Sequence, residues 1–156
     1  MRIASRIQSG FTMVEVLVAL VVLVIGLLGI AALLLRSLQD GRSAIFRTQA
    51  VTLAADLADR IRANRTGQAA YATLFADAVV AVPACDTTAG CAPAELAATD
   101  LSTWKATLAL LLPNGQGQVA VTPPVGAGEP FSYVVTVQWA EVAEAVPVTF
   151  QIGFQT

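Results

Sequence analysis

The chain has 156 residues, of which 56% are hydrophobic and 13% are charged, and its formal net charge is −2. Its length suggests one domain in addition to a long apolar segment near the start. From Phe11 onward the chain has seven basic and eleven acidic side chains, because Arg2 and Arg6 precede that point. This balance argues against a general nucleic-acid binder, whose affinity depends on clustered Lys and Arg. The absence of histidine removes the commonest general base and the commonest metal ligand.

An apolar run without a charged side chain covers residues 16–35. A helix of that length spans about 30 Å, which is roughly the hydrocarbon thickness of a bilayer. One acid, Glu15, lies four residues inside the apolar boundary at Phe11. An ionised carboxylate in that environment costs about 2.5 to 3.5 kcal/mol on insertion scales. We therefore expect Glu15 to have a functional partner.

A secretory signal peptide is one alternative for this segment, and a plain signal anchor is another. The apolar run is longer than the usual signal-peptide core of about 7 to 15 residues. It ends in Leu33-Leu34-Leu35-Arg36, so no small-x-small cleavage site follows it. A plain anchor would leave Glu15 unexplained. Basic residues flank the run on both sides, so orientation is inferred from the two cysteines instead, which favour residues 36–156 outside the cytoplasm.

The stretch Gly10-Phe11-Thr12-Met13-Val14-Glu15 resembles the N-terminal signal of type IV pilins and pseudopilins. That signal is a short basic leader ending in Gly, followed by Phe, Thr, two apolar residues and Glu. The resemblance implies that a membrane prepilin peptidase cuts between Gly10 and Phe11 and methylates the new amine of Phe11. It also implies that Glu15, the fifth residue after the cut, acts in assembly.

The chemistry of the cut agrees with this resemblance. Cleavage creates a cationic amine on Phe11, and Glu15 lies one helical turn further on. When subunits pack side by side, the opposite charge makes the carboxylate tolerable and penalises any register that leaves it unpaired. We therefore expect Phe11 and Glu15 to set the register of assembly. Gly26 and Gly29 indicate either close helix packing or local melting of the helix on assembly.

Helical spacing of apolar residues continues beyond residue 36, and the positions are Ile45 or Phe46, Ala50, Leu53, Leu57 and Ile61. No proline occurs before Pro83. The pattern predicts one long helix from about residue 11 to about residue 64, with a soft point near Gly41. Its second half is amphipathic and is expected to pack on a globular head.

Residues 56–65, Asp-Leu-Ala-Asp-Arg-Ile-Arg-Ala-Asn-Arg, form a second distinctive stretch. Taken alone, they predict a solvated helical face with near-neighbour ion pairs and with basic residues near the helix C-terminus. The stretch is also similar to the acid-Arg-x-Arg-Ala-Asn-Arg run of PilV-type minor pilins, the type IV pilus modification proteins. Pseudopilins of type II secretion do not usually have this run.

The head begins with an Ala-rich segment that we expect to be anchored by Tyr71, Leu74 and Phe75 as a short helix or a packed loop. Five residues separate Cys85 from Cys91. In an oxidising compartment this spacing predicts a small disulfide loop worth roughly 2 kcal/mol. A redox role is the alternative, but the spacing is not Cys-x-x-Cys and no histidine is present.

One helix and three strands are expected to complete the head. Pro93 suits a first helical position with Glu95 in the first turn, and Asp100 is a second candidate N-cap. The helical apolar positions that follow are Leu101, Trp104, Leu108 and Leu111, and a Pro113-Asn114-Gly115 turn ends the helix. Strand patterns occur around Val119 and Val121, over residues 131–139 and over residues 146–154. Together these elements predict an α+β, pilin-like fold in which one long N-terminal helix packs on a small antiparallel sheet.

The sequence has no phosphate-binding loop, no Gly-x-Ser-x-Gly and no metal-ligand cluster. Glu141 and Glu144 form a weak acidic pair that we expect to be solvated loop residues. We therefore expect no enzymatic activity, no cofactor and no metal.

The resemblance implies a minor pilin involved in pilus assembly, initiation or adhesion. The expected organisation is a leader over 1–10, a transmembrane assembly helix over 11–35, its amphipathic continuation over 36–66 and a periplasmic head over 67–156. Expected partners are the prepilin peptidase, other major and minor pilins, the inner-membrane assembly platform and inner-membrane lipid. The expected location is the bacterial inner membrane, crossed once, and then the filament. The alternatives are a minor pseudopilin of type II secretion and a membrane-anchored DNA-uptake or adhesin-type binding module.

Overall fold

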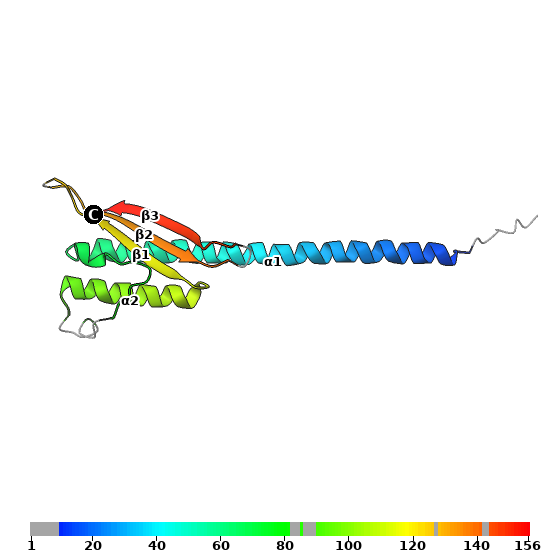
Figure 1. Ribbon diagram of the computed structural model, residues 1–156, viewed down its shortest axis with the longest axis horizontal. Helices are drawn as coiled ribbons and strands as arrows, with labels where there is room; N and C mark the ends of the chain where they lie inside the picture. The colour runs from blue at the N-terminus through cyan, green and yellow to red at the C-terminus, as the bar shows by residue number, and fades with distance from the viewer. Residues whose placement is uncertain (1–9, 82–84, 86–89, 127, 142–143) are drawn as a thin grey trace, which may run out of the picture. The chain divides into compact units, whose positions relative to one another are not determined.

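The computed structural model describes residues 10–81, 85, 90–126, 128–141 and 144–156. The chain divides into two compact units, Met1–Arg42 and Ser43–Thr156. The elements in chain order, shown in Figure 1, are α1 (Met13–Ala63), the short 3₁₀ helix η1 (Gln68–Tyr71), α2 (Pro93–Leu111), β1 (Gln116–Thr122), β2 (Ser132–Trp139) and β3 (Val148–Gln155). This is the predicted α+β, pilin-like arrangement.

Helix α1 begins two residues later than predicted and ends one residue earlier, and its helical conformation continues through Gly41. Thr12 caps its start, because the Thr12 hydroxyl accepts a hydrogen bond from the backbone N–H of Glu15 at 3.3 Å. In the first unit the large apolar side chains from Phe11 to Leu38 are all exposed. The helix is long and apolar enough to cross a membrane, a property that it shares with signal sequences.

In the second unit, one face of α1 is buried, at Ala50, Ala54, Leu57, Ala58 and Ile61. The spacing of three and four residues places these side chains on one stripe. Three of the five are alanines, so the backbone of α1 can come close to the elements that pack on it. The predicted core positions at Ala50, Leu57 and Ile61 are therefore confirmed.

The prediction for the start of this stripe is only half right. Phe46 packs against the core, and Leu53 is also partly buried against it. Ile45, by contrast, is 57% exposed. Phe46 lies four residues before Ala50 and so shares its face of the helix, whereas Ile45 lies outside that face.

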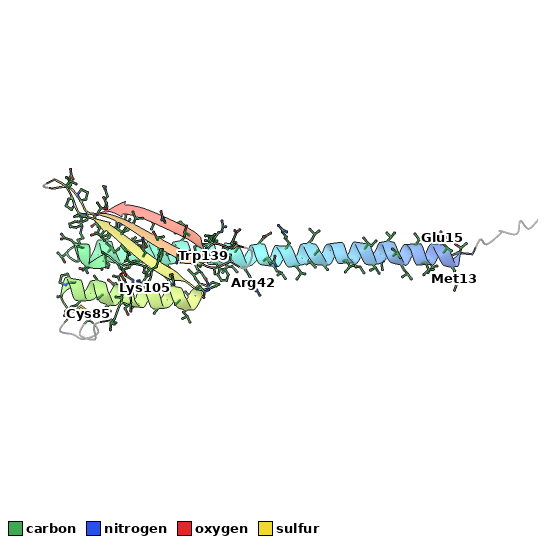
Figure 2. The ribbon with its side chains drawn as sticks, viewed as in Figure 1. Met13, Glu15, Arg42, Cys85, Lys105 and Trp139 are labelled. Atoms are coloured by element: carbon green, nitrogen blue, oxygen red, sulfur yellow. A yellow bond between two sulfur atoms is a disulfide. The ribbon has the colours of Figure 1, made fainter. Side chains whose placement is uncertain are left out.

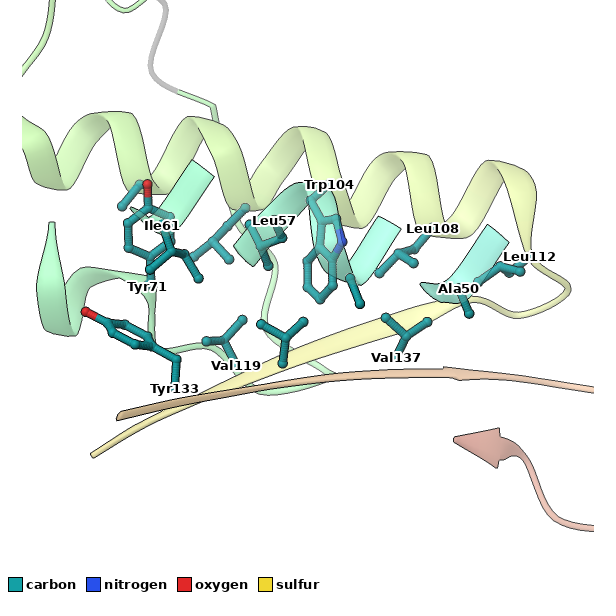
Figure 3. Close-up of a cluster of buried hydrophobic side chains, with 14 of the residues drawn as sticks. Ala50, Leu57, Ile61, Tyr71, Trp104, Leu108, Leu112, Val119, Tyr133 and Val137 are labelled. Carbon is teal, nitrogen blue, oxygen red and sulfur yellow. The ribbon is translucent and has the colours of Figure 1, made fainter. Parts of the chain in front are cut away.

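The three strands form one antiparallel sheet in the order β1-β2-β3. Val135 of the central strand lies opposite Val119 of β1 and Ile152 of β3. Alternate residues of β2 point into the core, and the fully or almost fully buried ones are Tyr133, Val135, Val137 and Trp139. Figure 3 shows Tyr133 and Val137 of this strand facing a layer of side chains from α1 and α2. All three predicted strands are present, with boundaries shifted by a few residues.

Helix α2 begins at Pro93 with Glu95 in its first turn, as predicted. The prediction that Asp100 caps a helix is wrong, because Asp100 lies inside α2 and is 8% exposed. Burial of this carboxylate is tolerated because it has tertiary hydrogen-bond partners, which are described below. Leu111 is also wrongly predicted as core: it is 41% exposed, and Leu112 is buried instead. Leu112 lies four residues after Leu108, as Leu108 does after Trp104, so it continues the buried face at the C-terminal end of α2, and Leu111 points beside that face.

The segment after α1 has one predicted anchor that is correct. Tyr71 is fully buried at the end of η1, whereas Leu74 is 63% exposed and Phe75 is half-buried. Thr73, which lies between Tyr71 and Leu74, pairs with Val119 in an isolated antiparallel bridge. This bridge attaches the segment to the edge of β1. Lys105 of α2 holds the segment from the other side by donating to the carbonyl groups of Leu74 and Asp77.

Candidate functional site

The residues predicted to act in processing and assembly lie together at the start of α1. Gly10 and Phe11 precede the helix and are exposed, and Glu15 lies in its first turn. Figure 2 labels Glu15 and Met13 at this end of the helix. Phe11 and Glu15 line the same shallow hollow along the helix, with Val16, Ala19, Leu20 and Leu23. An amine at Phe11 and the carboxylate of Glu15 therefore belong to one side of the helix start.

Thr12 is a residue of this site that the sequence prediction missed. Thr12 and Glu15 have the Thr-x-x-Glu spacing of a capping box, which could have revealed it. The half of the box in which the Thr12 hydroxyl accepts from the Glu15 N–H is present. A carboxylate in the first turn also interacts favourably with the helix dipole, by about 0.3 to 1 kcal/mol at exposed sites. Glu15 thus has a local structural role besides any role in assembly.

The second predicted feature, residues 56–65, connects α1 to other parts of the head. The guanidinium of Arg60 donates to Asp100 of α2 at 3.2 Å and to Asp56 of its own helix at 2.9 Å. Burial lowers the pKa of Arg60, but the hydrogen bonds to Asp100 and Asp56 outweigh it and the pKa is raised. Arg60 is therefore a fixed cation between two carboxylates.

Asp100 has a second partner on η1. The Tyr71 hydroxyl donates to Asp100 at 2.8 Å, and it accepts from the side-chain amide of Asn64 at 3.1 Å. The same amide donates to the carbonyl of Pro93 at 2.8 Å, at the start of α2. Burial and the hydrogen bond to Asp100 raise the pKa of the Tyr71 hydroxyl well above its ordinary value. The end of α1, η1 and α2 are thus joined by one buried network.

The remaining arginines of the stretch reach the sheet. The guanidinium of Arg62 lies 4.6 Å from the centre of the Phe154 ring of β3, within cation–π distance, and it pairs with Asp59 at 2.7 Å. Arg65 donates to the hydroxyl of Thr156 at 3.1 Å. The interpretation of residues 56–65 as a solvated face with near-neighbour ion pairs is right for Asp59 and Arg62. It is also right for Asp56 and Arg60, which form an exposed i,i+4 pair, but it is incomplete, because Arg60 and Asn64 also bind other elements of the head.

The prediction that Glu141 is a solvated loop residue is also wrong. Its carboxylate accepts hydrogen bonds from Ser43 of α1 at 2.8 Å and from the indole of Trp139 at 3.0 Å. Arg47 lies 3.9 Å away from the same carboxylate. Glu141 therefore attaches the end of β2 to α1, whereas Glu144 is exposed as predicted.

The predicted disulfide between Cys85 and Cys91 is present. Residues 86–89, which it encloses, lie outside the described part of the chain, as do Arg2 and Arg6 of the leader. Within the described residues, no group of three or more His, Cys, Asp or Glu side chains could hold a metal ion.

Two family models match the chain. Residues 5–31 match the prokaryotic N-terminal methylation motif, and residues 32–102 match a model described as type IV pilin Tt1218. Over these two ranges the chain is similar to type IV pilins. Comparisons with curated proteins and with solved structures give no match.

The two matches divide this pilin-like chain in a way that fits its structure. The methylation motif contains Gly10, Phe11, Thr12 and Glu15 and the first turns of α1. The pilin match runs through the rest of α1 and includes the whole 56–65 stretch, Tyr71, the disulfide and Asp100. The residues of the network around Asp100 therefore lie inside the part of the chain that resembles type IV pilins.

Proposed function

We propose that this pilin-like chain is a minor pilin of a type IV pilus. It is made as a membrane-anchored precursor with its head in the periplasm, cut by prepilin peptidase between Gly10 and Phe11, and then assembled with other pilins through residues 11–35. The observation that carries the proposal is the methylation motif over residues 5–31, placed on a helix that is long enough to span a bilayer. The inner-membrane assembly platform and lipid are the partners that this route requires.

The geometry of the helix start supports the assembly step. Phe11 and Glu15 line one hollow, so the amine released by cleavage can meet a carboxylate in its own chain or in a neighbour. In a low-dielectric surrounding, an unpaired carboxylate is costly and a paired one is tolerated. The pair thereby favours the register in which every Glu15 of the filament faces an amine.

The 56–65 stretch supports the PilV-type subclass over a pseudopilin of type II secretion, which is the second candidate. A DNA-uptake role is less well supported by the charges of the head. Arg60 is paired with Asp56 and Asp100, and Arg62 with Asp59. These pairs offset the positive charge that clustered phosphate contacts would need.

Substitution of Gly10 tests the processing step. We expect Gly10→Ala to block cleavage, so that the precursor keeps its leader and stays in the membrane. Mass spectrometry of the N-terminal peptide from the native host distinguishes the precursor from a chain that begins at methylated Phe11. A Gly10→Ala chain that still begins at Phe11 would refute the assigned cleavage site.

Substitution of Glu15 tests the assembly step. We expect Glu15→Ala to leave cleavage intact and to reduce the amount of this chain in sheared filaments by about tenfold or more, since about 1.4 kcal/mol per subunit already corresponds to tenfold. Thr12→Ala is the matched control, because it removes the helix cap but keeps the carboxylate. Equal losses in the two variants would mean that the stability of the helix start, and not the register of charges, explains the effect of Glu15→Ala.

A further inference from the structure

The two edges of the sheet differ in how they are covered. On the outer edge of β1, Thr73 and Val119 exchange backbone hydrogen bonds of 2.9 and 3.1 Å. On the outer edge of β3, no backbone pairing with another segment occurs among the described residues. Figure 1 shows β3 at the rim of the sheet. The head thus has one occupied edge and one open edge.

The register identifies the backbone groups that the open edge presents. Phe131 and Thr156 exchange two hydrogen bonds of 3.1 Å, so they form a hydrogen-bonded pair of the antiparallel ladder. Hydrogen-bonded and non-hydrogen-bonded pairs alternate along such a ladder. Counting back from Thr156, the backbone groups of Phe154, Ile152 and Phe150 therefore bond to β2. The N–H and C=O groups of the residues between them therefore point away from β2, and these residues are Thr149, Gln151, Gly153 and Gln155.

The open edge has none of the features that usually prevent strand pairing. Natural edge strands are commonly short, or carry charges, prolines or bulges. Strand β3 has eight residues, Val-Thr-Phe-Gln-Ile-Gly-Phe-Gln, with no charge and no proline, and its pairing with β2 is unbroken. Its apolar side chains, which face the core, are only half-buried. A further strand would cover both the backbone groups and this apolar strip.

A second copy of this chain does not suit the edge. A copy in the same orientation would have to offer its β1, because β1 and β3 run parallel within the sheet, and that edge is occupied at Val119 by Thr73. A copy that offered its own β3 in antiparallel orientation would reverse the direction of its residues 43–63, which run along the sheet in Figure 1. Subunits that assemble side by side through α1 have one common direction.

We propose that the open edge of β3 binds an extended strand from a different pilin-type subunit, parallel to β3, so that the sheet continues into the neighbouring head. This inference rests on the proposed function, since it takes the partner from the same filament. Addition of a strand to a sheet edge is an established mode of recognition, in which main-chain hydrogen bonds provide affinity and alternate side chains provide specificity.

The edge also defines the chemistry of the partner strand. We expect the partner to be apolar at alternate positions, which continue the strip formed by Phe150, Ile152 and Phe154. Arg65 lies at the C-terminal end of β3, where it donates to Thr156. Among the described residues it has no ion-pair partner. A parallel partner therefore has an acidic residue near its C-terminal end, opposite Arg65.

Site-specific photo-cross-linking in assembled filaments tests the proposal with the full chain. The photoreactive residue p-benzoylphenylalanine replaces Gln151 on the open edge or, as the matched control, Gln118 on β1. We expect Gln151 to cross-link to a strand segment of another pilin-type subunit, identified by mass spectrometry of the linked peptides, and we expect no such product from Gln118. Cross-links from Gln151 to a second copy of this chain or to a partner helix would overturn the proposal.

Three further variants, each with the photoreactive residue at Thr149, examine the backbone and the charge separately. Gln151→Pro removes an N–H that points away from β2, and Gln151→Thr keeps it; we expect the cross-link to fall about tenfold only with proline, the equivalent of one or two lost hydrogen bonds. Arg65→Glu reverses the charge of one exposed residue outside the strands, and we expect it to cause a similar loss. Unchanged cross-linking in both Gln151→Pro and Arg65→Glu would overturn the proposal. Absence of the chain from sheared filaments would instead refute the proposed function itself.

Discussion

Asp100 is the residue whose environment most clearly shows how the head is held together. A carboxylate in the middle of a helix that is packed on a core is costly unless charge and hydrogen bonds compensate it. Here Arg60 supplies the charge and Tyr71 supplies a neutral donor. The network therefore makes the junction of three elements specific, since Arg60 of α1 and Tyr71 of η1 together satisfy this carboxylate of α2.

Tyr71→Phe tests this network through its pH dependence. The substitution leaves Asp100 and Asn64 each without one partner, so we expect a loss of about 1 to 3 kcal/mol at neutral pH. The pKa of Tyr71 is raised above its ordinary value of 10.0, first by burial and then by Asp100, so the folded chain binds the phenolic proton more tightly than the unfolded chain. The contribution of this proton to the free energy of unfolding is then fully present below pH 10. It declines as the pH rises above 10, by up to about 1.4 kcal/mol per pH unit.

The measurement is the free energy of unfolding of the full chain in detergent, at a series of pH values from about 8 to 11. Two other groups also have shifted pKa values: burial raises the pKa of Tyr133 and lowers the pKa of Lys105. Both groups are present in the wild type and in Tyr71→Phe. Their contributions cancel in the difference between wild type and Tyr71→Phe. We expect that difference to shrink as the pH rises above 10. A constant difference would show that Tyr71 does not titrate differently in the folded and unfolded states.

At the scale of elements, the contact between α2 and the sheet depends on the absence of a side chain. A Cβ on Gly117 of β1 would lie closer than 3.0 Å to the ring of Trp104 and to Leu108. Trp104 cannot easily move, because its indole N–H donates to the carbonyl of Leu53 at 3.0 Å and the side chain is buried. Gly117 thus allows α2 to approach β1, while Trp104 connects α2 to α1.

We therefore expect Gly117→Ala to destabilise the head by about 1 to 3 kcal/mol through overpacking. Gly153→Ala is the control within the same sheet, since its Cβ would meet nothing nearer than the carbonyl of Tyr133 at 3.9 Å. Alanine is also the better strand residue, so this control should be neutral or gain up to about 1 kcal/mol. Denaturant unfolding compares the three proteins. Equal stability of Gly117→Ala and wild type would mean that Trp104 can shift at little cost.

The elements themselves were predictable from the sequence, because their signals are local. Helical spacing located the buried stripe of α1, and alternation located all three strands. The prediction failed where a tertiary partner decides the outcome. Asp100 resembles an N-cap until Tyr71 and Arg60 are seen to contact it, and Glu141 resembles a loop residue until Ser43 is seen beside it. The Thr12 cap was different: its Thr-x-x-Glu spacing was visible in the sequence and was overlooked.

The functional residues likewise include some that the sequence predicts and some that it cannot predict. The positions of Gly10, Phe11 and Glu15 follow from the motif alone, since they lie at a helix start that the sequence predicts. The open edge of β3 could not be predicted, because it depends on strand order and on the pairing of Thr73 with Val119. Neither of these is encoded in a local pattern. Long-range pairing is settled by packing and loop connections, which one sequence does not show.

For the molecule as a whole, the division into Met1–Arg42 and Ser43–Thr156 has a consequence for folding. Among the residues that the structure describes, every member of the buried core lies between Ala50 and Trp139 and so belongs to the second unit. The contacts that Glu141 makes with α1 also begin at Ser43. We expect a chain that begins at Ser43 to be soluble, since the apolar first part of α1 is removed, and to unfold cooperatively at the same denaturant midpoint as the head of the full chain in detergent.

A chain that begins at Thr48 is the matched comparison. It lacks Ser43 and Arg47, the partners of Glu141 on α1, and it lacks Phe46, which packs against the core. The loss of a hydrogen bond to a charged group and of a partly buried aromatic side chain should reduce the free energy of unfolding by about 2 to 4 kcal/mol relative to the Ser43 chain. Two chains of equal stability would place the structural limit of the head after Arg47. An unfolded Ser43 chain would instead show that the first unit is needed for the head to fold.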